Sequence, residues 1–207
     1  KKAVVVGGGP AGLAAAYFLT LGGVETTVLE RAEQMGGTVR YVIPGTKITP
    51  EVIDKDVALL QAVGVKMVNN RAVDDLNELR SAYDYVVLAL GAYGAGYLKG
   101  KGAAAAPVAG GFYQNAGIAV DAKGRPQLAG KTMATSLDRV YAVGDGLSGV
   151  TSVVECIRDG KQAAEAILGR AAAEDQFKLA DAAKVYARKG NLIDEADARE
   201  SCSRCLN

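Results

Sequence analysis

The chain has 207 residues, and its 49% hydrophobic and 23% charged residues are typical of a soluble globular protein. A net charge of +1 argues against nucleic acid or an anionic membrane as a partner, and no apolar run reaches the roughly 18 residues of a membrane-spanning helix. The sequence contains no histidine, which excludes Ser-His-Asp and Cys-His catalysis and any histidine-bound metal.

Cysteine usage and the start of the sequence bear on location and completeness. Three cysteines without a secretory signal favour a reducing compartment, so we expect a cytoplasmic protein. The sequence begins Lys1-Lys2, without an initiator methionine, and enters an apolar strand at once. We therefore expect a fragment of a longer chain, with N-terminal processing as the alternative.

A glycine cluster directly follows the first apolar run, Val4-Val5-Val6. Gly7, Gly9 and Gly12 fit the G-x-G-x-x-G pattern of a strand, tight turn and helix that bind a dinucleotide. In that pattern the first glycine allows the turn, the second lets the backbone approach a pyrophosphate, and the third lets the helix pack on the sheet. A glycine pattern alone is weak evidence for a dinucleotide site, so the interpretation depends on the flanking residues.

The flanking residues support a dinucleotide site. A helix begins at Pro10 and Ala11, and its N-terminus would offer N–H groups and partial positive charge to a diphosphate. A second strand over 25–29 ends at Glu30, close to the offset of about 20 residues at which a carboxylate binds a ribose diol. We therefore assign Glu30 to the ribose; a surface glutamate at a strand end is the alternative.

The segment after this acid contains a second glycine pair in a predicted loop. Its run Gly-Gly-x-x-Arg-Tyr-x-Ile-Pro over 36–44 resembles the FAD-binding part of the glutamate synthase small-chain type of reductase. That group includes the N-terminal region of dihydropyrimidine dehydrogenase and proteins assigned as selenate reductase subunits. The resemblance implies cofactor contacts from the following residues: Arg31, Gly37, Thr38 and Arg40. For Arg40, a solvated strand residue is the alternative.

Hydrophobic periodicity and capping residues predict the helices and strands between residues 49 and 92. Helices are expected from Thr49 to Gly64 and over 74–81, and strands over 65–68 and 85–92. The last strand is apolar without alternation, as expected for burial on both faces. Its Gly91-Ala92 ending matches the Leu-Ala-x-Gly-Ala signature of the family and places Gly91 beside the ligand crevice. The resemblance also implies that Val73 or Ala72 touches the adenine.

The stretch from Tyr93 to Asn115 is rich in Gly and Ala and has no amphipathic period. The resembling family carries a nicotinamide-binding domain about here, which needs roughly 100 residues, since one βαβ unit alone takes about 30. We therefore expect a flexible bridge over 93–115 where an NAD(P)H-binding domain is missing. A second glycine pattern starting at Gly91 is the alternative, but no helical run follows it.

Regular structure returns with an expected β-hairpin over 117–128 and a strand over 140–143 that ends in Gly144-Asp145. A strand followed by Gly-Asp resembles the closing FAD motif of this flavoprotein superfamily. The resemblance implies that Gly144 and Asp145 bind the cofactor and that the carboxylate accepts hydrogen bonds from the ribityl chain. An ordinary turn is the alternative.

A helix is expected after this turn, with Thr151 or Ser152 as its cap. The resemblance implies that Ser152 and the backbone near Val153 face the flavin, where the helix dipole would stabilise negative charge on the reduced ring. Cys156 lies on the apolar face of this helix, so we expect a core residue. A reactive thiol is the alternative.

Residues 170–207 are expected to form a helical tail that ends in Cys202-Ser-Arg-Cys205. A C-x-x-C pair is half of a zinc or iron–sulfur site, or a redox pair. The resemblance implies that Cys202 and Cys205 mark the truncated edge of a [4Fe–4S] domain. In this chain alone we expect two free thiols or a nonspecific disulfide.

Together these observations predict an α/β, three-layer, Rossmann-like FAD/NAD(P)-binding domain over 1–169, with a central parallel sheet and a small β-hairpin. The resemblance implies an oxidoreductase that passes electrons from NAD(P)H through FAD to iron–sulfur clusters or a partner domain. This chain alone should bind FAD without brisk NAD(P)H turnover. Two alternatives stay open, namely an FAD-binding scaffold without redox turnover and an enzyme that binds NAD in the glycine-rich turn.

Overall fold

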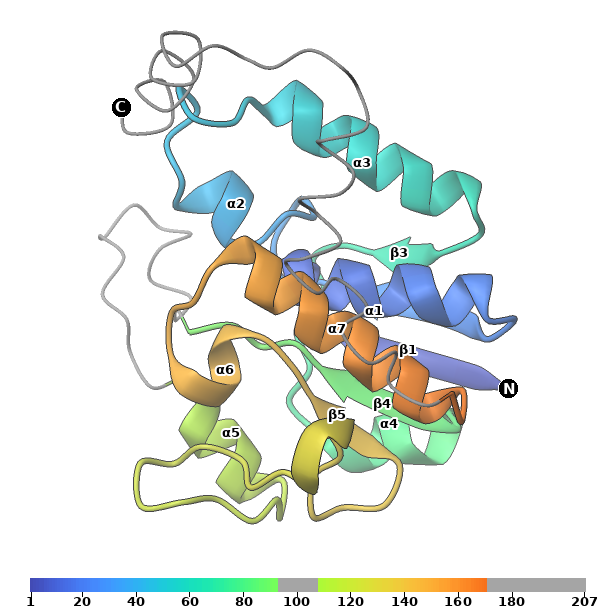
Figure 1. Cartoon of the computed structure of the whole chain (residues 1–207), viewed down its shortest axis with the longest axis vertical. Helices are drawn as coiled ribbons and strands as arrows, with labels where there is room; N and C mark the ends of the chain where they lie inside the picture. Colours follow the sequence, from blue (N-terminus) through green and yellow to red (C-terminus); the bar gives the residue numbers. More distant parts are fainter. Residues whose placement is uncertain (93–107, 171–207) are drawn as a thin grey trace, which may run out of the picture. The chain divides into compact units, whose positions relative to one another are not determined.

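A parallel sheet of five strands in the order β3-β2-β1-β4-β5 runs through the structure, a computed structural model that describes residues 1–92 and 108–170 (Figure 1). The strands are β1 (Lys2–Val6), β2 (Glu25–Leu29), β3 (Lys66–Val68), β4 (Tyr85–Leu88) and β5 (Val140–Ala142). The helices are α1 (Pro10–Leu21), α2 (Thr38–Tyr41), α3 (Pro50–Ala62), α4 (Leu76–Ala82), α5 (Val108–Asn115), α6 (Asp145–Ser148) and α7 (Val153–Ile167), with a 3₁₀ turn η2 (Gly130–Thr132).

Alternate residues of β1 enter two separate apolar layers. Ala3 and Val5 pack in a cluster with residues of α1 and α7, whereas Val4 and Val6 pack in a second cluster with residues of α4 and α5. Because both faces are covered, the strand is a continuous apolar run rather than an alternating one. The predicted three-layer, Rossmann-like α/β fold is therefore confirmed.

Helices α1 and α7 lie side by side on one face of the sheet (Figure 1). A Cβ atom added to Gly160 of α7 would lie 2.2 Å from the Ala11 carbonyl oxygen and 2.9 Å from the Ala15 nitrogen of α1. The alanine-rich sequence of α1 supplies the matching small surface, in which Ala15 and Ala16 are fully buried. Small residues on both helices thus allow close packing of the two backbones.

One part of the predicted Gly/Ala bridge is corrected by the structure, because residues 108–115 form helix α5. Tyr113 is fully buried in the layer beneath the sheet, and Phe112 packs against the same cluster. Two adjacent aromatic residues thus anchor a helix whose sequence lacks a helical period. Residues 93–107, and the predicted tail with Cys202 and Cys205, lie outside the described residues.

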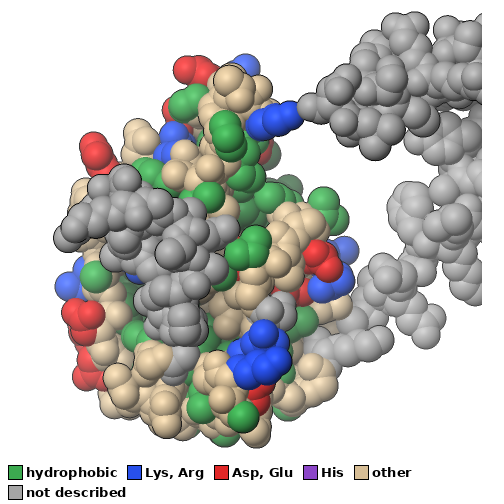
Figure 2. Space-filling view, turned by 90° about the vertical axis from the view of Figure 1, so that its left-hand side faces the viewer, with side chains coloured by type: hydrophobic (Ala, Val, Ile, Leu, Met, Phe, Trp, Pro, Cys, Tyr) green, Lys and Arg blue, Asp and Glu red, His purple; other side chains and the backbone are tan. Residues whose placement is uncertain are grey.

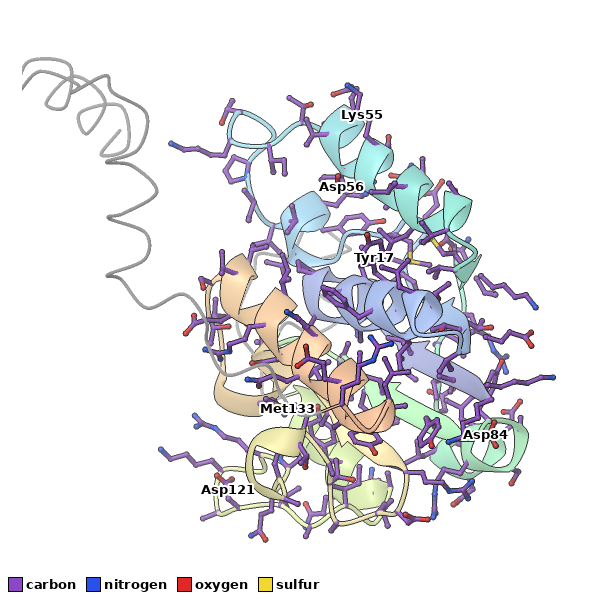
Figure 3. All side chains as sticks on the ribbon, turned by 45° about the vertical axis from the view of Figure 1, so that its right-hand side comes forward. Tyr17, Lys55, Asp56, Asp84, Asp121 and Met133 are labelled. Carbon is purple, nitrogen blue, oxygen red and sulfur yellow. The ribbon has the colours of Figure 1, made fainter. Side chains whose placement is uncertain are left out.

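The expected β-hairpin over 117–128 is reduced to a turn with one isolated antiparallel bridge, between Val120 and Pro126. Proline has no N–H group to extend such a ladder. The turn is held instead by Asp121 (Figure 3), whose carboxylate accepts hydrogen bonds from the N–H groups of Lys123 at 2.8 Å and Arg125 at 2.9 Å. These backbone hydrogen bonds hold the pKa of the Asp121 carboxyl below its usual value.

The surface carries charges of both signs. On the face drawn in Figure 2, acidic and basic side chains of the described residues are interspersed with hydrophobic ones, which matches the balanced charge of the whole sequence. Within the described ranges, no helix has both the length and the apolar character needed to cross a membrane.

Replacing Gly160 by alanine is expected to destabilise the domain, because the new methyl group would overlap the α1 backbone. Overpacking of this kind costs about 1–3 kcal/mol in the free energy of unfolding, which urea denaturation measures. Gly111 of α5 is the matched control, since a Cβ atom there meets nothing within 4 Å. Gly111→Ala should keep or raise stability, by up to about 1 kcal/mol. Equal unfolding free energies for the two variants would contradict the close packing of α1 and α7.

Candidate nucleotide-binding site

The carboxyl ends of the parallel strands meet at one edge of the sheet. Val6 is paired in register with Leu29 of β2 and with Leu88 of β4, so the chain leaves all three strands side by side. The chain moves from β1 to β2 and β3 in one direction and to β4 and β5 in the other. Open α/β sheets bind ligands in the crevice at such a reversal of strand order.

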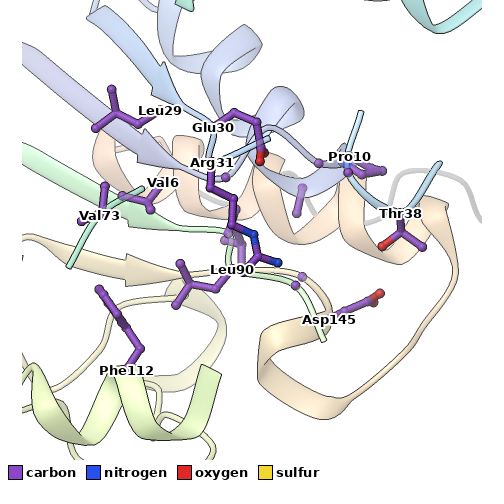
Figure 4. A pocket seen from close by; sticks show the side chains of 18 of the residues that line it. Val6, Pro10, Leu29, Glu30, Arg31, Thr38, Val73, Leu90, Phe112 and Asp145 are labelled. Carbon is purple, nitrogen blue, oxygen red and sulfur yellow. The ribbon is translucent and has the colours of Figure 1, made fainter. Parts of the chain in front are cut away.

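A cavity of about 310 Å³ lies at this edge of the sheet (Figure 4), at the lower end of the range for small-molecule sites. Most of the predicted cofactor-binding residues line it: Gly7, Gly9, Pro10, Ala11, Glu30, Arg31, Gly37, Thr38, Val73, Gly91, Gly144 and Asp145. Four predicted residues do not belong to its lining: Gly12, Arg40, Ser152 and Val153. One cavity thus joins the glycine-rich turn after β1 to the acidic turn after β5.

The turn after β1 requires glycine at two positions for steric reasons. Gly7 has a φ angle of +108°, and a Cβ atom there would lie 2.2 Å from the Ala89 carbonyl oxygen. A Cβ atom on Gly12 would lie 2.0 Å from the Gly7 carbonyl oxygen, so this glycine lets α1 start close to the turn. Gly9 differs, because a Cβ atom there would meet only the Gly37 Cα, at 3.9 Å. The fold tolerates a side chain at Gly9, but that side chain would stand at the cavity wall.

Glu30 ties the glycine-rich turn to β2 with both carboxylate oxygens. Oε2 accepts a hydrogen bond from the Gly8 N–H at 2.6 Å, and Oε1 accepts one from the Ala32 N–H at 2.7 Å. The side chain is buried yet lines the cavity. Each carboxylate oxygen has capacity for a further hydrogen bond, so Glu30 is able to accept from a ribose hydroxyl without giving up the turn.

The opposite end of the cavity is formed by the turn between β5 and α6. Gly144 has a φ angle of +75°, and a Cβ atom there would lie 2.7 Å from the Ala11 Cβ, so this glycine brings the turn against the start of α1. Asp145 follows, and its Oδ1 accepts hydrogen bonds from the Thr151 N–H at 2.9 Å and the Thr151 hydroxyl at 2.7 Å. The carboxylate is thus held at the cavity wall.

The two ends of the cavity differ in polarity. Val73 and Phe112 lie at one end, and Thr38 and Asp145 lie at the other (Figure 4). The Arg31 side chain extends from beside Glu30 into the region between these ends (Figure 4). This arrangement suits an elongated ligand with a flat apolar group at one end, negative charge in the middle and hydroxyl groups at the other end.

Arg40 lies apart from the cavity. Its Nε donates to the Met35 carbonyl oxygen and its Nη2 donates to Asp54 Oδ1 of α3, both at 2.5 Å, and its side chain is only 7% exposed. The residue therefore links the short helix α2, which occupies part of the predicted loop, to α3. This position differs both from the predicted cofactor contact and from a solvated strand residue.

The start of α7 is capped by its own side chains. Ser152 Oγ accepts a hydrogen bond from the Glu155 N–H at 3.2 Å, and Glu155 Oε2 accepts one from the Ser152 N–H at 3.0 Å. The backbone hydrogen bond holds the pKa of the exposed Glu155 carboxyl below its usual value. Ser152 and Val153 do not line this cavity, and their flavin contacts remain a prediction.

Several lining residues were missed by the sequence analysis. Phe112 lay in the segment interpreted as a bridge, where the signal was an aromatic pair in a Gly/Ala-rich stretch. Arg71 follows β3, and its N–H donates to the Glu30 carbonyl oxygen at 2.8 Å; no sequence signal marked it. Cys156 is a buried core residue, as predicted, and it also lines the cavity.

No group of three or more Cys, Asp or Glu side chains in residues 1–92 and 108–170 is placed to hold a metal ion. The predicted half-site of Cys202 and Cys205 lies outside that part and remains a prediction.

Substitutions at Gly9 are expected to separate folding from binding. Asn and Asp are both favourable at this helix-capping position, so Gly9→Asn and Gly9→Asp should leave the free energy of unfolding within about 1 kcal/mol of the parent. Both side chains would obstruct the cavity wall, and the carboxylate would also repel a diphosphate. Calorimetric titration with ADP should show weaker binding for Gly9→Asn and a further loss, by about tenfold or more, for Gly9→Asp. Unchanged ADP affinity in both variants would exclude the diphosphate site at this turn.

Comparison with known proteins agrees with this geometry. Residues 5–63 match the family model of the NAD(P)-binding Rossmann-like domain. A thioredoxin reductase from Gloeobacter violaceus superposes on 86% of this chain and 98% of its own, with a TM-score of 0.63 and 14% identity. At that identity the likeness concerns the fold alone.

Sequence relatives match the N-terminal part of the chain. The glutamate synthase [NADPH] small chain of Bacillus subtilis is 38% identical over 95 residues, which are 44% of this chain and 19% of the relative. That of Azospirillum brasilense is 42% identical over 101 residues, 47% of this chain and 21% of the relative. The putative oxidoreductase YgfK of Escherichia coli is 39% identical over 89 residues, 42% of this chain and 9% of the relative. The matched segments thus span about a fifth or less of these relatives. The N-terminal part of the chain is therefore a Rossmann-like dinucleotide-binding region similar to the glutamate synthase small chains and YgfK, as the sequence predicted.

Proposed function

We propose that this chain is the FAD-binding part of an NAD(P)H-linked oxidoreductase. The observation that supports the proposal most directly is the single cavity lined by both the Gly9 turn and Asp145. A nucleotide that reaches from one to the other needs a diphosphate near the turn and hydroxyl donors near the carboxylate. FAD has both, in that order.

The residues present fit such a nucleotide. The first N–H groups of an α-helix have no partner within the helix, and α1 has no acidic residue in its first turn and no capping side chain at Gly9. Its partial positive charge therefore stays available for a diphosphate. Glu30 would hold the ribose of the adenosine, Val73 would contact the adenine, and Asp145 would accept from the ribityl hydroxyls.

The chain's own residues bind and orient in this proposal, and none has to transfer a proton. A flavin bound here would supply hydride and single-electron chemistry, which in the complete protein would connect NAD(P)H to iron–sulfur clusters or a partner domain. The matched segments span only about a fifth of the small chains. The proposals of an NAD(P)H domain and of an iron–sulfur partner therefore depend on the family resemblance.

Direct binding of NAD(P) by the first βαβ unit is the second candidate function. The match of residues 5–63 to the NAD(P)-binding family model favours it. Against it stands Asp145, which a ligand confined to the first βαβ unit would not need. The two candidates differ in which nucleotide binds more tightly.

We expect FAD to bind the purified chain at one molecule per chain, and more tightly than NADPH or ADP. Calorimetry gives the three affinities, and ADP should compete with FAD because both would occupy the Gly9 turn. Tighter binding of NADPH than of FAD would overturn the proposal in favour of the second candidate.

Redox measurements test whether bound flavin carries electrons and whether this chain lacks an NAD(P)H-binding domain. Bound flavin should be reduced by dithionite and reoxidised reversibly, whereas steady-state NADPH oxidation by this chain should be slow or absent. Irreversible reduction would favour an FAD-binding scaffold without redox turnover. Brisk NADPH oxidation would contradict the expectation that this chain lacks an NAD(P)H-binding domain.

A further inference from the structure

We infer that Thr151 and Cys156 are positioning residues, which fix the Asp145 carboxylate so that one oxygen is held by the protein and the other is presented to the ligand. The inference deepens the proposed function, because it concerns the ribityl end of the same cavity. It assigns a role to two side chains whose sequence signals indicated only a helix cap and a core residue.

Three donors converge on a single oxygen of Asp145. Oδ1 lies 2.9 Å from the Thr151 nitrogen, 2.7 Å from the Thr151 hydroxyl oxygen and 3.2 Å from the Cys156 sulfur. The Thr151 hydroxyl oxygen also lies 3.6 Å from the Cys156 sulfur, so the three groups form one cluster. No hydrogen bond to a described residue uses Oδ2, and Asp145 lines the cavity.

The backbone around Asp145 does not by itself determine where the carboxylate points. Asp145 begins a helix of only four residues, between Gly144 and Gly149, both with positive φ angles. One donor, Cys156, belongs to α7, a helix of 15 residues that packs on α1, and the other two come from Thr151, which directly precedes the Ser152 cap of that helix. The carboxylate is thus oriented by a larger, better-packed element than its own, which reduces the ordering that a ligand must impose.

The Cys156 thiol is suited to act as a donor. It is 6% exposed and lies in the apolar core beneath α7. The pKa of this thiol is raised to about 11, mainly by burial and also by the Asp145 carboxylate, although the hydrogen bond with Thr151 lowers it. The group therefore keeps its proton at neutral pH and presents an S–H to Oδ1. Packing alone explains its burial but not its direction toward a carboxylate.

The first arm of the test needs no ligand. The S–H stretching band of a cysteine lies where proteins absorb little else in the infrared, and it moves to lower wavenumber when the thiol donates a hydrogen bond. Subtracting the spectrum of Cys156→Ser isolates the Cys156 band. We expect Asp145→Ala to move that band to higher wavenumber at neutral pH. An unmoved band would refute the contact and the inference, whether or not the protein binds FAD.

The second arm compares FAD with ADP, which lacks the ribityl chain. Cys156→Ala and Thr151→Val should each lower FAD affinity by about 3–10-fold, the size of one lost hydrogen bond, and leave ADP affinity unchanged. Cys156→Ser should restore FAD affinity, because its hydroxyl also donates. Ile157→Ala is the matched control on the same helix, since Ile157 is exposed and does not line the cavity.

The outcomes separate the inference from the proposed function. A parallel loss of FAD and ADP affinity, or equal losses for Cys156→Ala and Cys156→Ser, would show a packing role and overturn the inference. The parent chain could fail to bind FAD while Asp145→Ala still moves the infrared band. The proposed function would then be wrong, and the inference that Cys156 holds the Asp145 carboxylate would be supported. An FAD loss for Cys156→Ala that disappears in the Asp145→Ala background would support the positioning role.

Discussion

Two close approaches around Ala11, at the start of α1, determine the shape of the pocket. Cβ atoms added to Gly144 and Gly160 would lie 2.7 Å from the Ala11 Cβ and 2.2 Å from its carbonyl oxygen, respectively. The β5–α6 turn and helix α7 thus pack directly on the helix that carries the glycine-rich turn. Because protein interiors are close-packed, this contact sets how far Asp145 lies from Gly9. Two segments from opposite ends of the described chain become walls of one cavity for that reason.

Features that depend on local steric constraints could be predicted from the sequence. Gly7 and Gly12 fill positions where any side chain would overlap a neighbouring backbone oxygen, and the apolar run of β1 is continuous because both of its faces are covered. Tertiary contacts could not be predicted in this way. Helix α5 is stabilised by the buried Tyr113 and the partly buried Phe112, which pack with residues distant in the sequence, and Arg40 is held by an ion pair with Asp54. Neither contact leaves a periodic trace in the sequence.

Helices α1 and α7, which pack together, differ in the side chains at their partly positive N-termini. Helix α1 starts at a bare glycine, with no acidic side chain in its first turn, so its N–H groups remain available to an anion. Helix α7 places Glu155 over its own N-terminus through the reciprocal hydrogen bonds with Ser152. The carboxylate offsets part of the dipole there. The structure thus concentrates its capacity for binding a diphosphate at one helix end, beside the glycine-rich turn.

The cavity wall also has a consequence for how this fold accepts additional sequence. Gly91, just after β4, and Phe112, within α5, both line the cavity. The described residues on either side of 93–107 thus include two that line the cavity. In a relative with a whole domain at this point, two short tethers would keep that domain near the mouth and raise its local concentration there. The same attachment would confine a second substrate-carrying module to the side of the molecule on which the cavity lies.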